Sequence, residues 1–247
     1  MEDTACRELQ WVSSGSSLHM DSPPPYRYKK HISSYVKDSE DLQNQLLKVH
    51  ILSDGLRIGS SDAVSMYTII DTAHNLLTIE QWLAKISPHL PSSFPKNLIL
   101  EAIKLVMENN IFLFGNQHYL QKTGTAMGTP CACILATIYF SLHEDFLIQK
   151  YSNYILFYKR FIDDAIYLWR TNGDKTSSLL AFDQFKHDMD QFGLLRWTHL
   201  PLSNKVHFLD LTITIDFANK KFLFKTFQNP QTSTSTSLQT VHILQAC

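Results

Sequence analysis

The 247-residue chain has few of the features that mark several common protein classes. It has only four cysteines, and no two of them have the Cys-x-x-Cys spacing of a zinc-ligand pair, which argues against a structural zinc site. Nothing suggests a disulfide framework, which favours a reducing compartment. No apolar run approaches the roughly 18 residues that a membrane-spanning helix needs. The first residues lack the basic segment and apolar core of a signal peptide, so the sequence predicts an intracellular protein, nuclear or cytoplasmic.

An excess of positive charge is also missing. The chain has 22 Lys and Arg residues against 23 Asp and Glu residues, for a formal net charge of -1. Free-standing nucleic-acid binders usually carry a basic excess for their phosphate contacts, so this balance is a poor match to that class. Hydrophobic residues make up 44% of the chain and aromatic residues 12%, which predicts a sizeable core and excludes wholesale disorder.

Composition divides the chain into three segments. Residues 1–31 are rich in Ser and Pro and are predicted to form an irregular leader, because the run Pro23-Pro24-Pro25 cannot be helical. Residues 32–230 carry the core-forming patterns, and residues 231–247 form a Ser/Thr-rich irregular tail. Within the middle segment, helical and strand patterns are interspersed without a strict βαβ rhythm, which predicts an α+β fold.

Hydrophobic periodicity places the individual elements. Helices are predicted over residues 40–47, 72–86, 96–110, 132–146 and 179–192, with Asp38 or Ser39 capping the first and Gly193 ending the last. A strand begins at residue 56 and leads into a loop near residue 67. Residues 111–119 are predicted to form a hairpin around Gly115-Asn116, and residues 206–217 and 221–227 to form two strands.

The dipeptide Asp163-Asp164 is flanked on both sides by aromatic and β-branched residues, which predicts a β-hairpin with two carboxylates at its tip. Two adjacent anions repel each other. Solvent, a basic neighbour such as Arg160 or a divalent cation can compensate that repulsion. Taken alone, the pair is more simply interpreted as a solvated turn.

Two upstream motifs change this interpretation. Asp62 follows a predicted strand, and a Gly-punctuated loop, Gly124-Thr125-Ala126-Met127-Gly128-Thr129-Pro130, lies between it and the Asp-Asp pair. Such a loop lets a base pair or phosphate approach the backbone closely. Nucleotidyl transfer uses two divalent cations about 3.5–4 Å apart, held by carboxylates from at least two rigid elements. Asp62 and the pair Asp163-Asp164 offer such a set.

In this order the motifs resemble the palm of a reverse transcriptase. Over roughly residues 32–230, the residues within the motifs are similar to those of Penelope-like retroelement polymerases. That similarity is carried by Ser34-Tyr35-Val36-Lys37-Asp38-Ser39, Asp62-Ala63-Val64-Ser65-Met66-Tyr67-Thr68, Gly124-Thr125-Ala126-Met127-Gly128-Thr129, Lys159-Arg160-Phe161-Ile162-Asp163-Asp164, Phe208-Leu209-Asp210-Leu211 and, in degraded form, Lys225-Thr226-Phe227-Gln228-Asn229-Pro230.

The resemblance implies an RNA-directed DNA polymerase that uses two Mg²⁺ ions, with Mn²⁺ as a substitute. It implies a palm in which an antiparallel sheet packs on helices, with incomplete fingers and the start of a thumb. Asp62 and Asp163 would bind both metals, Asp164 would support them electrostatically, and Ala63 would lend a backbone carbonyl.

The same resemblance assigns the binding residues. Tyr67 would lie under the incoming sugar and select deoxynucleotides, while Gly124, Met127 and Gly128 would form the nucleotide-binding loop. The template and primer contacts would come from Gln121 and from Phe208, Leu209 and Asp210. The implied partners are an RNA template, a DNA primer and dNTPs.

The chain departs from the family upstream of Asp62, where about sixty residues contain no convincing basic fingers strand. No GIY-YIG endonuclease sequence follows Pro230. The expectation is therefore a truncated retroelement copy. An inactive remnant with a palm-like fold or residual nucleic-acid binding is the main alternative. A metal-dependent hydrolase using the same aspartates has less support, because no further acidic or His ligand recurs at helical spacing. The sequence does not predict the oligomeric state.

Overall fold

The structure, a computed structural model, describes residues 31–51, 54–125, 129, 131–171 and 174–227. The predicted tail, all but one residue of the predicted leader, and both Met127 and Gly128 lie outside the described residues. The described chain forms two compact units. The helical unit contains residues 31–35, 65–145 and 191–195, and the sheet unit contains residues 36–64, 146–190 and 196–227.

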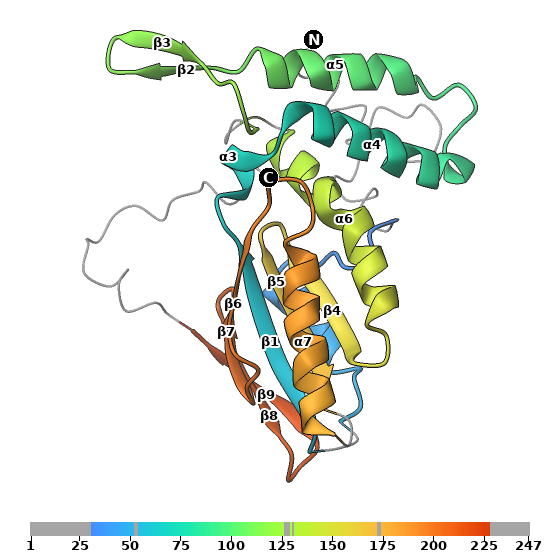
Figure 1. The fold of residues 1–247 in the computed structure, drawn as a ribbon, viewed down its shortest axis with the longest axis vertical. Helices are drawn as coiled ribbons and strands as arrows, with labels where there is room; N and C mark the ends of the chain where they lie inside the picture. Colours follow the sequence, from blue (N-terminus) through green and yellow to red (C-terminus); the bar gives the residue numbers. More distant parts are fainter. Residues whose placement is uncertain (1–30, 52–53, 126–128, 130, 172–173, 228–247) are drawn as a thin grey trace. The chain divides into compact units, whose positions relative to one another are not determined.

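The helical unit is built around two neighbouring helices, α4 (Thr72–Ile86) and α5 (Lys96–Glu108) (Figure 1). Asp71 caps α4 by accepting a hydrogen bond from the backbone N–H of His74. The other elements of this unit are α3 (Met66–Ile69), the short 3₁₀ helix η2 (Ser87–His89), the hairpin β2 (Ile111–Phe114) and β3 (Gln117–Leu120), and residues 132–145 of α6 (Ala132–Lys150).

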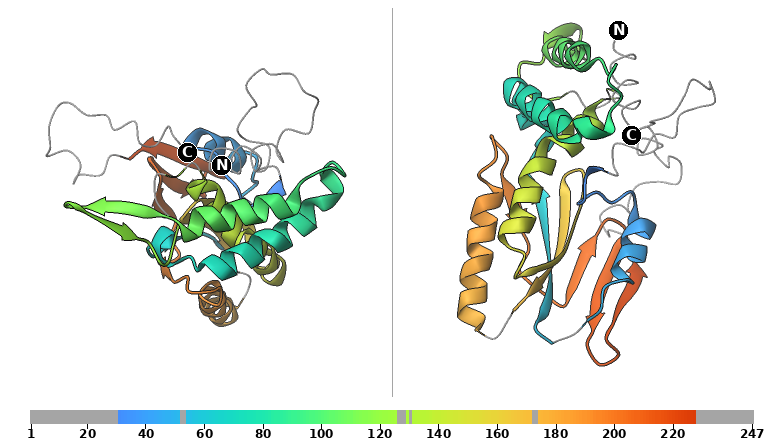
Figure 2. Two further views of the ribbon diagram at one scale, coloured as in Figure 1. Left: turned by 90° about the horizontal axis from the view of Figure 1, so that it is seen from above. Right: turned by 90° about the vertical axis from the view of Figure 1, so that its right-hand side faces the viewer.

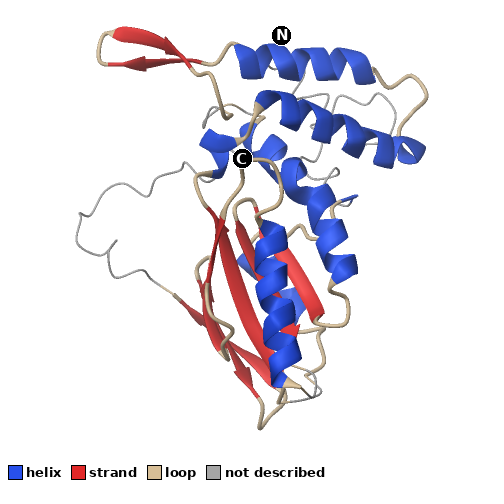
Figure 3. Cartoon of the chain, viewed as in Figure 1, coloured by secondary structure: helices blue, strands red, loops and turns tan. Residues whose placement is uncertain are grey.

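The sheet unit contains two antiparallel sheets (Figure 3). The four-stranded sheet has the order β4-β5-β1-β6, with β1 at Leu56–Ala63, β4 at Ile155–Phe161, β5 at Asp164–Arg170 and β6 at Trp197–His199. The three-stranded sheet has the order β7-β8-β9, with β7 at Lys205–Phe208, β8 at Leu211–Asp216 and β9 at Lys221–Thr226. Two helices, α2 (Ser39–Leu46) and α7 (Lys175–Met189), complete the unit.

Both faces of the four-stranded sheet are covered, as the right-hand view of Figure 2 shows. On one face, the rings of Tyr167 and Trp169 pack against Phe182 and Phe185 of α7. The opposite face packs against α2 and the inner face of the three-stranded sheet in one core cluster, which includes Ile58, Ile166, Leu168, Leu42, Leu46, Val206, Phe208 and Ile213. Burial on both faces fixes the positions of the central strands.

The predicted α+β architecture is confirmed, and several element predictions are confirmed in detail. The helix α4 has the predicted bounds, the hairpin at β2 and β3 turns at residues 115–116, and Asp38 caps α2 by accepting a hydrogen bond from the N–H of Asp41. Trp82 and Trp169 are core residues, 1% and 0% exposed.

Other predictions were wrong at element ends. The helix α7 ends at Met189 rather than Phe192, because the Asp190 carboxylate accepts a hydrogen bond from the N–H of Trp197 and the chain leaves the helix there. Gly193 has a φ of 57° in the following loop and does not cap the helix. Residues 206–217 form two strands rather than one, because Leu209 takes a φ of 52° and turns the chain.

Cys131 and Cys133 are both disulfide-bonded, contrary to the expectation from the sequence, since their spacing carries no recognised disulfide or zinc signal. Among the described residues, the structure contains no helix whose length and apolar character would let it cross a membrane.

The close packing at Gly59 gives a test of the core. Gly59 pairs with Tyr167, and a Cβ added at Gly59 would lie 2.0 Å from Cε2 of that buried ring. We expect Gly59→Ala to lower the free energy of unfolding by on the order of 1–3 kcal/mol, because the ring has no room to move. Urea denaturation measures the change. The matched variant Gly115→Ala, where an added Cβ meets nothing within 4 Å, should cost less despite its φ of 60°. An equal or smaller cost at Gly59 would contradict this packing.

Candidate active site

The register of the four-stranded sheet brings two predicted carboxylates together. Asp62, at the end of β1, lies directly opposite Asp164, the first residue of β5. Side chains of directly opposed residues in antiparallel strands share a face, with Cβ atoms about 4.5–5.5 Å apart. Asp62 is exposed, whereas Asp164 is partly buried. The two acids are 102 positions apart in sequence and adjacent in the sheet.

The third carboxylate belongs to the turn between β4 and β5. Because Phe161 pairs with Asp164, only Ile162 and Asp163 form the turn. Ile162 has a φ of 53°, a strained conformation for a β-branched residue. The carbonyl of Asp163 accepts a hydrogen bond from the N–H of Ala63 at 2.9 Å. This bond ties the turn to the end of β1, so all three acids lie at one end of the sheet.

Arg160 supports this turn from inside the unit. Its side chain is only 2% exposed, and its Nη1 donates a hydrogen bond to the carbonyl of Ile162. Its own carbonyl accepts the N–H of Val36 at 3.1 Å. From the sequence, Arg160 is predicted only as a basic neighbour of the acids. Its burial could have been found from the alternation of β4, where Arg160 follows buried Tyr158 by two positions.

The electrostatics of the three acids show uncompensated negative charge. Burial raises the pKa of Asp164, and the charges of Asp163 and Asp62 raise that pKa further, to about 6. Burial and the charge of Asp163 raise the pKa of Asp62. Burial also raises the pKa of Asp163, while its own backbone N–H and the charge of Arg160 act in the opposite direction. The protein surroundings thus leave repulsion that a cation would relieve.

The donor set has the chemistry that Mg²⁺ prefers, since it consists of carboxylates and the backbone carbonyl of Ala63. In the described part of the chain, no group of three or more His, Cys, Asp or Glu side chains is arranged so that it could hold a metal ion. Asp62 is exposed, so the fit rests on donor chemistry and on the face that Asp62 shares with Asp164 rather than on a preformed cage. Metal binding by Asp62, Asp163 and Ala63 stays a prediction.

A hydrogen-bonded network missed by the sequence analysis lies one residue before Asp62. The Ser61 hydroxyl is 3.0 Å from the hydroxyl of Tyr167 and 2.8 Å from Nδ1 of His199. Burial lowers the pKa of His199, which favours the neutral ring. Because the network joins β5, β1 and β6, it fixes the three strands behind the acids. The strand β6 has only three residues and gives no usable periodicity, so the sequence offered no signal for this histidine.

Two predicted nucleotide-binding residues meet in the helical unit. The N–H of Gly124 donates to the carbonyl of Ile70 at 2.9 Å, and the N–H of Thr125 donates to the carbonyl of Tyr67 at 2.7 Å. Gly124 has a φ of 84°, and a Cβ there would lie 2.4 Å from the Tyr67 carbonyl oxygen. Only glycine therefore fits at this position. The Tyr67 hydroxyl donates a hydrogen bond to Sγ of Cys133 at 3.4 Å, and this bond helps to fix the orientation of the Tyr67 ring.

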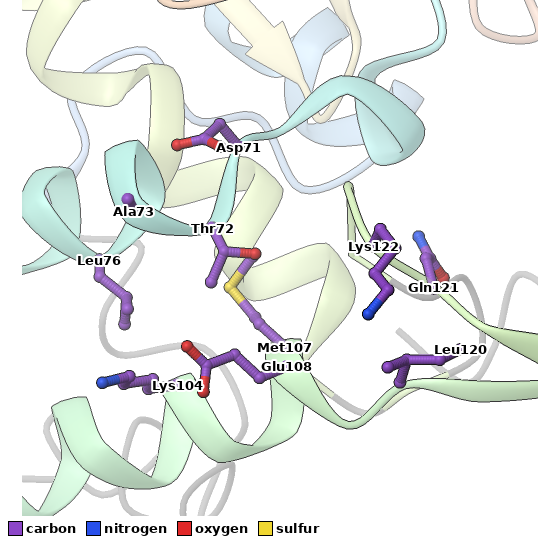
Figure 4. Close-up of a pocket in the computed structure, with 10 residues that line it drawn as sticks. All are labelled: Asp71, Thr72, Ala73, Leu76, Lys104, Met107, Glu108, Leu120, Gln121 and Lys122. Atoms are coloured by element: carbon purple, nitrogen blue, oxygen red, sulfur yellow. The ribbon is translucent and has the colours of Figure 1, made fainter.

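Gln121 lies beside a hollow of about 720 Å³ in the helical unit (Figure 4). The hollow is lined by the start of α4, the end of α5 and residues 120–122. The side-chain amide of Gln121 donates to the carbonyl of Thr123 at 2.8 Å, and its backbone N–H donates to Asn110. The predicted template contact is not tested by this placement.

The predicted primer-binding residues form the turn between β7 and β8. Phe208 is 3% exposed and belongs to the core, so its side chain supports the hairpin from inside. Leu209 makes the turn, and the Asp210 carboxylate accepts a hydrogen bond from the hydroxyl of Ser39 at the start of α2. These residues lie at the turn that replaces the predicted continuous strand, and their role toward a primer stays a prediction.

The raised pKa of Asp164 predicts a pH-dependent effect on stability. Its pKa is near 3.8 when unperturbed and about 6 in the fold, so the folded state binds the proton more tightly. The stability that this proton supplies is complete below about pH 3.8 and is lost as the pH rises through about 6. We expect Asp164→Asn to raise the free energy of unfolding by on the order of 1–3 kcal/mol at pH 8 and by little at pH 4.

Thermal or urea unfolding of both proteins at several pH values measures this difference. Asp183→Asn is the matched control, because the Asp183 side chain is 67% exposed and forms an exposed ion pair with Lys186 across one helical turn. That substitution should change stability by a few tenths of a kcal/mol at most. A stabilisation of Asp164→Asn that is the same at pH 4 and pH 8 would contradict the raised pKa.

Solved structures of known proteins share the fold of this chain. No protein-family model matches the chain, and neither does any curated protein sequence. An apo telomerase from Candida tropicalis, truncated from its C-terminal domain, matches with a TM-score of 0.64 and 15% identity, over 91% of this chain and 45% of that chain. A telomerase from Candida albicans in complex with a TWJ fragment of telomeric RNA matches with a TM-score of 0.58 and 15% identity, over 96% of this chain and 39% of that chain.

A structure described as an RNA-dependent RNA polymerase with vp4 and dsRNA matches with a TM-score of 0.56 and 10% identity, over 83% of this chain and 19% of that chain. The chain thus spans less than half the length of these polymerases. At such identities the likeness concerns the fold alone. The chain has a reverse-transcriptase-like polymerase fold, in which antiparallel palm-type sheets pack on helices.

Proposed function

We propose that this chain is the reverse transcriptase domain of a Penelope-like retroelement, an RNA-directed DNA polymerase that adds deoxynucleotides to the 3′-hydroxyl of a primer. The observation that carries the proposal is the register of β1 with β5. It brings Asp62 face to face with Asp164, beside Asp163, within a polymerase-like fold. This convergence is what two-metal nucleotidyl transfer requires of residues from separate elements.

The chain's own residues account for the main parts of this chemistry. Asp62, Asp163 and the Ala63 carbonyl would hold Mg²⁺ ions, which lower the pKa of the attacking hydroxyl and neutralise the triphosphate. Asp164 adds negative charge beside them, and Arg160 holds the turn in place. In the helical unit, the N–H of Thr125 donates to the carbonyl of Tyr67 and Gly124 lies against the Tyr67 backbone, which would hold the glycine loop beside the ring that is proposed to meet the incoming sugar.

The residues within the sequence motifs support the proposed family and the proposed substrates. The run Lys159-Arg160-Phe161-Ile162-Asp163-Asp164 and the loop that begins at Gly124 support a Penelope-like element, with RNA as template, DNA as primer and dNTPs as substrates. The structural neighbours support nucleic-acid partners, because one of them is a telomerase bound to a fragment of telomeric RNA.

A second candidate function is nucleic-acid binding without catalysis. Two observations favour it: the formal net charge of -1, and the lack, among the residues with a described position, of a three-ligand group that could hold a metal ion. In this candidate function, the chain has the polymerase-like fold but does not catalyse nucleotidyl transfer. Turnover by the purified chain separates the two.

Primer extension on an RNA template tests the polymerase proposal. The purified chain, given a DNA primer, dNTPs and Mg²⁺ or Mn²⁺, should lengthen the primer. Asp163→Asn should lower the rate by on the order of 10²-fold or more, because it removes a charge from the position where metal ligands are needed.

Asp183→Asn, which removes an exposed carboxylate from α7, is the control and should leave extension unchanged. If the unsubstituted chain extends no primer with either metal, the proposed activity is refuted and the non-catalytic candidate takes its place. If Asp163→Asn extends as fast as the control, the site assignment is wrong.

The role of Tyr67 gives a separate prediction. If the ring lies under the incoming sugar, Tyr67→Ala opens space for a 2′-hydroxyl. The preference for dNTPs over rNTPs, taken from the ratio of kcat/KM values, should then fall by about 10- to 100-fold. Tyr119→Ala is a suitable control, because Tyr119 lies on the exposed hairpin and is 42% exposed. An unchanged sugar preference in Tyr67→Ala would show that this ring does not meet the sugar.

A further inference from the structure

The three-stranded sheet of the sheet unit has two chemically different faces. Its inner face carries apolar side chains that belong to the core, including Val206, Ile213 and Phe222. The alternate positions point outward. Three lysines, Lys205, Lys221 and Lys225, are exposed there, and so is His207. This basic face is the set of outward positions of β7, β8 and β9.

The strand register aligns these side chains in rows that run across the three strands. The central strand β8 contributes two threonines, which lie between a lysine or histidine on β7 and a residue of β9. In one row Lys205 pairs with Thr214, and in the next His207 pairs with Thr212, which pairs with Lys225. Because neighbouring strands are about 4.8 Å apart, residues of the two edge strands in one row lie roughly 10 Å apart, with a threonine of β8 between them.

Negative charge is nearly absent from this face. All outward positions of β7, β8 and β9 are described, and Asp216 is the one acid among them. The Asp216 carboxylate accepts hydrogen bonds from the backbone N–H and the side-chain amide of Asn219, at 3.1 and 2.8 Å, and these bonds lower its pKa. It therefore closes the turn at one end of the sheet, next to Lys221. The remainder of the face is positive or neutral.

We propose that the basic face binds the phosphate backbone of a nucleic acid. Lysine ammonium groups and threonine hydroxyls are donors that commonly contact phosphate oxygens, and such contacts need no base sequence. The chain as a whole carries a formal net charge of -1, so a concentration of three cations around one acid is a local feature of this sheet. The inference goes beyond the proposed function, because backbone binding by this face does not need the carboxylate site.

Edge strands also carry lysines for another reason, since charged side chains prevent edge-to-edge aggregation. That explanation predicts no contribution of these lysines to nucleic-acid affinity. The two explanations therefore differ in the salt dependence of binding, because each lysine that contacts a phosphate of a duplex adds about 0.9 to the slope of log K against log salt.

Fluorescence anisotropy of the full chain with a labelled RNA–DNA hybrid duplex, between about 50 and 200 mM salt, measures this slope. The triple variant Lys205→Gln, Lys221→Gln, Lys225→Gln should lower the slope by about 2 to 3 and weaken binding about 10- to 100-fold at the lowest salt. The matched control replaces three lysines of helices α5 and α7 by Gln, namely Lys96, Lys104 and Lys175. It makes the same change in net charge and should alter the slope by much less.

A substitution that adds charge guards against the case in which the triple variant fails to fold. Leu223 lies at the centre of the β9 part of the face and is 41% exposed. Leu223→Lys should tighten binding several-fold and steepen the slope by about 1, whereas Leu223→Gln should change neither. Circular dichroism of each variant verifies the fold.

The outcomes separate this inference from the proposed polymerase activity. If the unsubstituted chain extends no primer but binds the duplex with the expected salt slope, and the triple variant lowers that slope, only the polymerase proposal fails. Equal effects of the two triple variants, no change with Leu223→Lys, or no measurable binding by the unsubstituted chain would each overturn the phosphate-binding face.

Discussion

The antiparallel register between β1 and β5 is the constraint on which the candidate site depends. A shift of one residue would send every side chain of β1 to the other face of the sheet, and Asp62 would then lie away from Asp164. The register is fixed far from the acids, by the fit of Gly59 against the Tyr167 ring and by the pairing of Ile58 with Leu168. Core packing on both faces of the sheet therefore determines where the carboxylates meet.

The same arrangement places several interactions that destabilise the folded state at one end of the sheet. Three carboxylates with raised pKa values lie together, and Ile162 occupies a backbone conformation that disfavours β-branched residues. Buried Arg160 and the hydrogen bond from the N–H of Ala63 to the carbonyl of Asp163 stabilise the turn against this repulsion and strain. The aromatic cluster of α7 and β5 stabilises the unit away from the acids. The site is thus a locally destabilised region that a rigid sheet holds in place, as is common for functional sites.

The sequence predicted those parts of the fold that local physics determines. The periodicity of α4, the Gly-Asn turn of the β2–β3 hairpin and the capping by Asp38 all depend on residues close together in the chain. The meeting of Asp62 with the Asp-Asp turn could be inferred only through resemblance, because pairing across 102 positions leaves no local signal. The strand β6 and the partners of His199 were missed because a strand of three residues gives no usable periodicity, whereas the burial of Arg160 could have been found from the alternation of β4. The end of α7 was misplaced because a tertiary hydrogen bond from Trp197 to Asp190, rather than the nearby glycine, ends the helix.

The β2–β3 hairpin has a consequence for handling the protein. All four residues of β2, Ile-Phe-Leu-Phe, are between 51% and 74% exposed, and Phe112 stacks on Tyr119 across an isolated two-stranded ribbon. Both edges of this ribbon offer unpaired backbone groups beside exposed apolar side chains, a combination that nucleates intermolecular β-pairing. In concentrated solution the ribbon would be the first place for copies to adhere and precipitate. A charged residue at Leu113 would be the simplest means to improve the yield of soluble material.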